Sequence, residues 1–157
     1  MFFSIIIPVQ KINNYIFETC EKLKELRNRN FEILIFPDEA EARDGKLEKQ
    51  LGARIIPSGR VSPALKRDMA MQYANGDILA FIDDDAYPEK DWLDIADKYL
   101  SSGEHIAAIG GPQVTPPQDS FWQKVSGAVF LSPLSGSALI RYWPGKGVQE
   151  VDDWPSV

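Results

Sequence analysis

Short apolar runs that alternate with helical segments constrain the fold of this chain more than any other feature of its sequence. Residues 2–7 (FFSIII) and 31–36 (FEILIF) are rich in β-branched and aromatic side chains. Such almost continuously apolar runs are typical of strands buried on both faces. Residues 53–56 and 78–82 predict two further strands, and residues 106–109 predict a fifth. The pattern therefore favours a sheet covered by helices on both sides.

The segment after the first run has the spacing of an amphipathic helix. Apolar residues recur at Ile16, Cys20, Leu23 and Leu26, and Glu and Lys residues lie between them. Residues 38–52 are charged and have no clear period, which predicts a loop or an irregular helix.

Two further helices have recognisable start signals. Ser62 followed by Pro63 predicts a helix start, since serine is a good N-cap and proline suits the first helical position. Asn75-Gly76 predicts its end, with Gly76 in the left-handed conformation. Its expected apolar stripe is Leu65, Met69 and Tyr73. Another helix is expected from Pro88 onward, with an inward face of Trp92, Ile95, Ala96, Tyr99 and Leu100.

Strands and helices alternate through residue 109, which predicts an α/β domain with parallel strands and right-handed crossovers. In such sheets, ligands bind at the carboxyl ends of the strands. Residues 110–147 hold six of the eleven glycines and five of the eleven prolines, so regular structure is expected to thin out there. We therefore expect one domain over residues 1–157, with a core at 1–109 and a Gly/Pro-rich region at 110–157.

Composition narrows the class of protein. Of the 157 residues, 44% are apolar and 25% are charged, which is enough for a packed core and too apolar for disorder. Twenty-three acidic residues against seventeen basic ones give a net charge of −6, which argues against a nucleic-acid partner. The single cysteine, Cys20, excludes an intramolecular disulfide and indicates a reducing compartment. No apolar run approaches the ~20 residues of a membrane-spanning helix.

Three consecutive carboxylates, Asp83, Asp84 and Asp85, follow the apolar run at 78–82. Like charges in contact raise one another's pKa, so this arrangement is costly unless a cation offsets it. Carboxylate oxygens suit Mg²⁺ or Mn²⁺, which take one or two carboxylates together with substrate phosphates. In an extended segment, Asp83 and Asp85 would point the same way. The alternative is a solvated acidic turn that caps the next helix, and the position at a strand end favours the metal.

Two other sites carry charge near predicted strand ends. Asp38 follows the second strand and is either a nucleobase acceptor or a turn residue. Lys66 and Arg67 lie early in a helix, where basic residues oppose the helix dipole unless an anion is close. An ordinary exposed helix face is the simpler explanation for them. His105 lies in a polar turn and is not expected to take part in catalysis.

Taken together, four segments resemble the family 2 glycosyltransferases: SIIIPV, FEILIFPDE, residues 57–93 and AAIGGPQVTP. The likeness covers nearly the whole chain in the same order. It implies the GT-A fold, which is the Rossmann-like α/β fold of nucleotide-diphospho-sugar transferases, with a mostly parallel central sheet flanked by helices. It also makes residues 1–109 the nucleotide-binding core and residues 110–157 the start of an acceptor-side region.

The resemblance assigns roles to the matching residues. Pro8 and Val9 would line the nucleobase pocket, Asp38 would hydrogen-bond the base, and Arg67 would lie against the nucleotide. The segment Asp83–Asp85 matches the Asp-x-Asp motif. Within it, Asp83 and Asp84 would contact the nucleotide sugar, and Asp83 with Asp85 would bind Mn²⁺ or Mg²⁺ at the diphosphate.

By the same resemblance, an acceptor hydroxyl attacks the anomeric carbon with inversion, and a carboxylate acts as general base. That base is expected beyond Val157, because Asp152 and Asp153 match only the stretch leading towards it. The chain is therefore expected to be the truncated donor-binding half. Gln10-Lys11 departs from the common Tyr-Asn, which leaves the nucleobase contacts open.

The expected partners follow from the same likeness. A UDP-sugar is the favoured donor, although Asp38 alone does not exclude other bases. The acceptor is a saccharide or a lipid-linked molecule in polysaccharide or glycolipid synthesis. The location is cytoplasmic, at the inner membrane face in the full-length protein, and self-association that buries the C-terminal edge is compatible with this.

Three alternatives are considered, and the second of them is rejected. A haloacid-dehalogenase-like phosphatase also has Asp-x-Asp after an apolar strand, but Tyr87 stands where a Thr or Val is usual. A nucleotidyltransferase needs a Gly-rich loop after the first strand, and residues 8–14 have no glycine. The third alternative is a non-catalytic module that binds a metal–nucleotide complex and transfers nothing.

Overall fold

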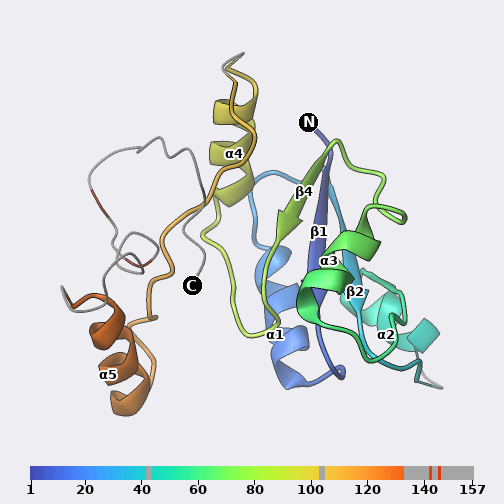
Figure 1. Cartoon of the computed structure of the whole chain (residues 1–157), viewed down its shortest axis with the longest axis horizontal. Helices are drawn as coiled ribbons and strands as arrows, with labels where there is room; N and C mark the ends of the chain where they lie inside the picture. Colours follow the sequence, from blue (N-terminus) through green and yellow to red (C-terminus); the bar gives the residue numbers. More distant parts are fainter. Residues whose placement is uncertain (42–43, 103–104, 133–141, 143–144, 146–157) are drawn as a thin grey trace. The chain divides into compact units, whose positions relative to one another are not determined.

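Four parallel strands form the central sheet, in the order β3-β2-β1-β4. The computed structural model describes residues 1–41, 44–102, 105–132, 142 and 145. The strands are β1 (Phe3–Pro8), β2 (Phe31–Phe36), β3 (Arg54–Ile55) and β4 (Ile78–Phe81). The helices are α1 (Asn14–Leu23), α2 (Asp44–Leu51), α3 (Pro63–Ala70), α4 (Trp92–Leu100) and α5 (Phe121–Phe130). The predicted parallel sheet flanked by helices is confirmed (Figure 1).

Strand β1 is buried along its whole length, and its side chains pack alternately into two separate hydrophobic clusters, one on each face of the sheet. Ile5 and Ile7 belong to a larger cluster with buried residues of α1, α2 and α4. Ile6 belongs to a smaller cluster on the other face, which includes Ala70 of α3. Within the first 107 residues the sheet is therefore the middle of three layers, with α3 over one face and α1, α2 and α4 over the other (Figure 1).

Three segments differ from the sequence-based expectations. The expected fifth strand is wrong, because residues 105–110 contain no strand and Ile109 is exposed. Part of residues 38–52 is a regular helix, α2, since Leu47 and Leu51 lie one turn apart and both are buried. Residues 121–130 form α5, where regular structure was expected to thin out. Its start has a capping box, in which Ser120 and Gln123 each bond the other's backbone N–H.

The two compact units of the chain are Met1–Ala107 and Ala108–Val157. The first contains the whole sheet and α1 to α4, and the second contains α5. Among the described residues, no helix is both long and apolar enough to cross a membrane.

The buried faces and the ends of the helices also differ in part from the sequence-based expectations. Helix α1 ends at Leu23, and Leu26 is buried beyond it. Helix α3 starts as predicted, with the Ser62 side chain accepting from the Leu65 N–H, but it ends at Ala70. Its buried face is Lys66 and Ala70, while Leu65 and Tyr73 are exposed. Helix α4 begins at Trp92 and not at Pro88, and it buries Leu93, whereas Ile95 is 46% exposed.

Gly76 serves a close approach and not the predicted left-handed helix end. Among the described residues, positive φ angles occur at Gly52 and Gly59 only. A Cβ on Gly76 would lie 2.5 Å from the backbone nitrogen of Ser4. The Gly76 N–H also donates to the Ser4 hydroxyl at 2.9 Å. Only a residue without a side chain lets the chain enter β4 this close to β1.

The Glu32 carboxylate joins several segments at the end of the sheet where the strands begin. Glu32 of β2 accepts from the Ser4 hydroxyl (2.7 Å), the Asn75 N–H (2.6 Å) and Arg54 (3.2 Å). Burial alone would raise the pKa of Glu32. The hydrogen bonds from Asn75, Ser4 and Arg54 outweigh that effect and lower the pKa below its ordinary value of 4.5.

We expect Glu32→Gln to lower the free energy of unfolding by about 1–2 kcal/mol at neutral pH, because charge-assisted hydrogen bonds are lost. The folded-state pKa of Glu32 is depressed. The wild type therefore has the full contribution above the unfolded value and loses it as the pH falls through the folded value. Urea unfolding of both proteins, at neutral pH and at a series of acidic pH values, measures the difference. The gap between them should narrow in acid.

The matched control is Glu18→Gln, at an exposed position on α1. It should leave the free energy of unfolding nearly unchanged across the same pH series. A gap for Glu32→Gln that is the same in acid as at neutral pH would show that its charge is not what stabilises this edge.

Candidate functional site

The candidate site lies where the strands end. The chain passes from β1 to β2 on one side of β1 and later reaches β4 on the other side. The crevice between these connections is a topological switch point, where α/β sheets bind ligands. A cavity of about 700 Å³ opens here. It is lined by Pro8, Val9, Gln10, Lys11, Asn13, Asp38, Arg60, Val61, Pro63, Lys66, Asp83, Asp84 and Asp85.

Backbone pairing continues past the strand ends and holds Asp38 from both sides. The Asp38 N–H donates to the Gln10 carbonyl at 3.1 Å, and the Gly59 N–H donates to the Asp38 carbonyl at 3.0 Å. The Val9 N–H donates to the Phe36 carbonyl at 3.1 Å. Gly59 has a φ of 77°, which favours glycine at this turn. The cavity rim at Asp38 is therefore part of the sheet's hydrogen-bond network.

Lys66 is the main polar group beneath this rim. Its side chain is 2% exposed, and its ammonium donates to the Val9 carbonyl (2.6 Å), the Phe36 carbonyl (3.2 Å) and Asp38 Oδ1 (2.5 Å). An ammonium has three N–H donors, and here each has an acceptor. The expectation of an exposed helix face is therefore wrong for Lys66. The anion close to Lys66 is the carboxylate of Asp38.

Arg67 pairs with the acidic segment. Its guanidinium donates to Asp83 Oδ1 at 2.8 Å, and the Asp83 side chain is 57% exposed. Arg67 is not among the residues that line the cavity, and its Nε is buried without a hydrogen-bond partner in the described part of the chain. The proposed contact of Arg67 with a nucleotide stays a prediction.

The three aspartates form a turn and not the extended segment that we expected. The Ala86 N–H donates to the Asp83 carbonyl at 3.2 Å. Asp84 Oδ2 accepts from Asn13 Nδ2 at 2.8 Å. The buried Thr19 hydroxyl lies 2.9 Å from the Asp84 carbonyl and 3.1 Å from that of Ala86. The turn is thus tied to α1, while Asp83 and Asp85 both line the cavity.

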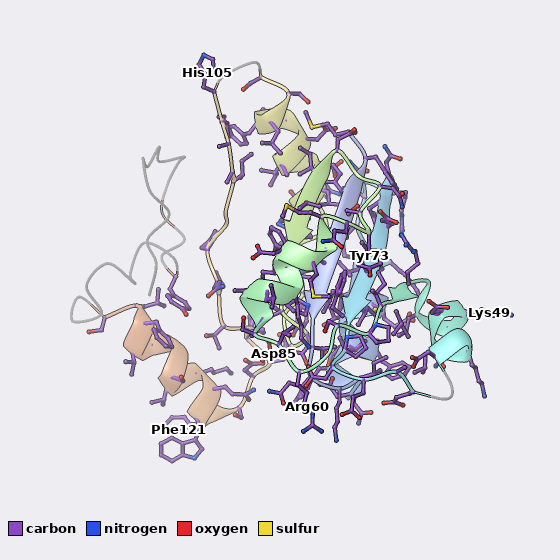
Figure 2. All side chains as sticks on the ribbon, turned by 45° about the vertical axis from the view of Figure 1, so that its right-hand side comes forward. Lys49, Arg60, Tyr73, Asp85, His105 and Phe121 are labelled. Carbon is purple, nitrogen blue, oxygen red and sulfur yellow. The ribbon has the colours of Figure 1, made fainter. Side chains whose placement is uncertain are left out.

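Most of the predicted site residues come together. Pro8, Val9, Asp38 and the three aspartates line one cavity, and Arg67 reaches it through Asp83. Asp85 and Arg60 lie at the same end of the sheet (Figure 2). His105 is exposed and does not line this cavity. Asp152 and Asp153 lie outside the described residues.

Sequence reasoning missed Asn13 and Arg60 and did not predict the burial of Lys66. Asn13 precedes an amphipathic helix, as an N-cap does, and its Oδ1 accepts from the Ile16 N–H. Lys66, expected on an exposed helix face, is buried one helical turn before Ala70. Arg60 lines the cavity and pairs with Glu39 at 3.0 Å, but nothing in the sequence marked it.

The carboxylates of the acidic turn fit a hard divalent cation that takes only two protein ligands. No group of three His, Cys, Asp or Glu side chains that could hold a metal occurs among the residues the structure describes. Asp83 and Asp85 therefore supply two carboxylates at most. Mg²⁺ and similar ions often bind in this way, with water and substrate phosphates completing the shell.

The parallel sheet and the cavity at its topological switch point place this chain among the α/β domains that bind ligands at the strand ends. The sequence profile of Glycosyl transferase family 2 matches residues 4–153, so the chain belongs to that family. The predicted family is thereby confirmed. A Rickettsia felis protein described as an uncharacterized glycosyltransferase is 30% identical over 107 residues. The match covers 66% of this chain and 18% of that relative, so the chain spans less than a fifth of its length.

Solved structures confirm the fold. TarS of S. aureus in complex with UDP aligns with a TM-score of 0.61 and 20% identity, over 76% of this chain and 38% of that chain. A Pyrobaculum calidifontis mannosyltransferase in complex with GDP-Man and Mn²⁺ aligns with a TM-score of 0.56 and 19% identity. That alignment covers 74% of this chain and 36% of the mannosyltransferase. The predicted GT-A fold is thus confirmed.

We expect Thr19→Val to lower the free energy of unfolding by about 1 kcal/mol, because the carbonyls of Asp84 and Ala86 lose their shared donor. Thr19→Ser keeps the hydroxyl and serves as the matched control. Urea unfolding of both variants measures the change. Equal stabilities of the valine and serine variants would show that the hydroxyl does not hold the acidic turn.

Proposed function

We propose that the chain binds the nucleoside diphosphate of a sugar donor in the switch-point cavity. The whole protein would transfer that sugar to an acceptor hydroxyl with inversion. One observation carries the proposal: Asp38 at the end of β2 and the acidic turn after β4 line one cavity, with the end of β1 between them. This arrangement provides an acceptor for a base at one side and carboxylates for a metal–diphosphate at the other.

The comparisons support a nucleotide-sugar ligand. TarS has been solved with UDP and with UDP-GlcNAc, and the mannosyltransferase has been solved with GDP-Man and Mn²⁺. Membership of Glycosyl transferase family 2 favours this function over the phosphatase and nucleotidyltransferase hypotheses. A non-catalytic module that binds a metal–nucleotide complex stays the second candidate, since the cavity residues alone account for binding.

The donor-binding roles follow the position of each residue. Pro8 and Val9 would contact the base, and Asp38 would accept one of its N–H groups. Asp84 would contact the nucleotide sugar from the acidic turn, and Arg67 would help to place the donor through Asp83. These contacts would orient the sugar for attack by the acceptor.

Asp83 and Asp85 would hold Mn²⁺ or Mg²⁺. When bound, the ion supplies positive charge that stabilises the departing diphosphate. Arg67 adds a positive charge beside Asp83, and its hydrogen bond to Oδ1 leaves Oδ2 as the oxygen with no bond to Arg67. The Asn13 and Thr19 contacts keep the turn in place without occupying Asp85.

The transfer step itself needs a residue beyond those placed at this cavity. The acceptor oxygen forms a bond to the anomeric carbon, and the bond from that carbon to the diphosphate oxygen breaks. The acceptor proton passes to a carboxylate acting as general base within hydrogen-bond reach. The acceptor is proposed to be a saccharide or a lipid-linked molecule at the cytoplasmic side of a membrane.

Calorimetric titration of UDP into the chain, with and without Mn²⁺, tests this assignment. We expect Mn²⁺ to strengthen binding, and Asp85→Asn to weaken binding in Mn²⁺ by about tenfold or more because one of two carboxylate ligands is lost. Asp94→Asn is the matched control, since Asp94 lies in α4 and does not line the cavity.

Two results would contradict the proposal in different ways. An Asp85→Asn variant that binds UDP as tightly as the wild type in Mn²⁺ would remove the metal assignment. A folded wild type that binds neither UDP nor GDP would remove the donor site.

A further inference from the structure

The oxygens of the Asp38 carboxylate are not equivalent. Oδ1 accepts from Lys66 Nζ at 2.5 Å, whereas Oδ2 has no hydrogen-bond partner in the described part of the chain. The Asp38 side chain is 20% exposed and lines the cavity. The acceptor capacity that Asp38 offers to a ligand is therefore concentrated on one oxygen.

Lys66 lines the cavity and fixes this arrangement, but its ammonium has no N–H left to donate to a ligand. Its other two donors are taken by the carbonyls of Val9 and Phe36, at the ends of β1 and β2. With all three donors used, no N–H of Lys66 remains for a phosphate or a base. Because two of its acceptors belong to paired strands, the ammonium has a fixed position, and Oδ1 is held beneath the rim with it.

A carboxylate with one available oxygen discriminates among nucleobases. Uracil presents a single imide N–H between two carbonyl groups, and one acceptor oxygen satisfies it. Guanine presents two adjacent donors, N1–H and N2–H, which a carboxylate binds with both of its oxygens. Because Oδ1 already accepts from the buried Lys66 ammonium, it would be a weaker and poorly directed acceptor for the second guanine donor, and an imperfectly paired donor is costly.

We propose that Lys66 is a specificity-determining positioning residue: by holding Oδ1 of Asp38, it selects a uracil-type base over guanine in the donor. This inference rests on the proposed function, since it concerns the base of the same donor. The fold alone does not decide the base, because structures of this fold have been solved with UDP and with GDP-Man.

The same arrangement predicts what an amide would do at position 38. In Asp38→Asn, the ammonium of Lys66 still requires an acceptor, so the amide oxygen faces Lys66 and the NH₂ group faces the cavity. A donor then stands where the acceptor was. Uracil has N3–H at this place, whereas N3 of cytosine is an acceptor. Asp38→Asn should therefore weaken UDP binding and favour CDP.

The test is calorimetric titration of UDP, GDP and CDP, each with Mn²⁺, into the folded chain and its variants. The wild type should bind UDP at least about tenfold more tightly than GDP. Asp38→Asn should lose at least about tenfold in UDP affinity and bind CDP more tightly than UDP. Lys66→Met frees Oδ1, so the UDP/GDP affinity ratio should fall towards one.

Lys49→Met is the matched control for the lysine substitution. Lys49 is exposed on α2 and points away from the sheet (Figure 2), so the affinity ratio should stay at its wild-type value. Circular dichroism checks that each variant is folded. If Lys66→Met does not fold, Asp38→Asn decides, because it keeps the buried ammonium partnered.

The outcomes separate the two proposals. Binding of UDP and GDP with equal affinity by the wild type, or a wild-type ratio in folded Lys66→Met, would overturn this inference and leave the donor site standing. Stronger binding of UDP than of CDP by Asp38→Asn would also overturn it. A folded wild type that binds none of the three nucleotides would overturn both.

Discussion

The site depends on the pairing of β1 with strands on both of its sides. The register sets Pro8 opposite Phe36 of β2 and Ile6 opposite Phe81 of β4. Because of this register, Asp38 and the acidic turn reach the same edge of the sheet as the end of β1. A slip of one residue would exchange the two faces of a strand, and the separate clusters around Ile5 and Ile6 make that exchange costly.

Charged side chains connect neighbouring strands at both ends of this sheet, where the strands begin and where they end. At the amino-terminal edge, Glu32 accepts hydrogen bonds from β1, from β3 and from the segment before β4. At the carboxyl-terminal edge, Lys66 donates to the ends of β1 and β2 and to Asp38. Charges removed from water are tolerated when they are paired and hydrogen-bonded, and both the half-buried Glu32 and the buried Lys66 meet this condition. The first stabilises the fold, while the second shapes the cavity.

The sequence predicted the features that local physics controls. Continuous apolar runs marked the strands, Ser62-Pro63 marked the start of α3, and the position of Asp38 and Asp83–Asp85 after strands placed them at one edge. It did not predict the burial of Lys66, because Leu65 and Met69 formed a more apolar stripe on the same helix. Burial there is decided by carbonyls of distant strands, which no local pattern displays.

Asn13 links two parts of the protein that are far apart in the chain. Its carbonyl oxygen caps α1, and its amide group holds Asp84. One side chain therefore makes both the cap of α1 and a hydrogen bond to the acidic turn, so the ordered start of α1 also fixes the donor that Asp84 meets. These contacts preorganise the turn: its backbone and the Asp84 carboxylate are held before any ligand arrives, so less of the binding energy is consumed in ordering them.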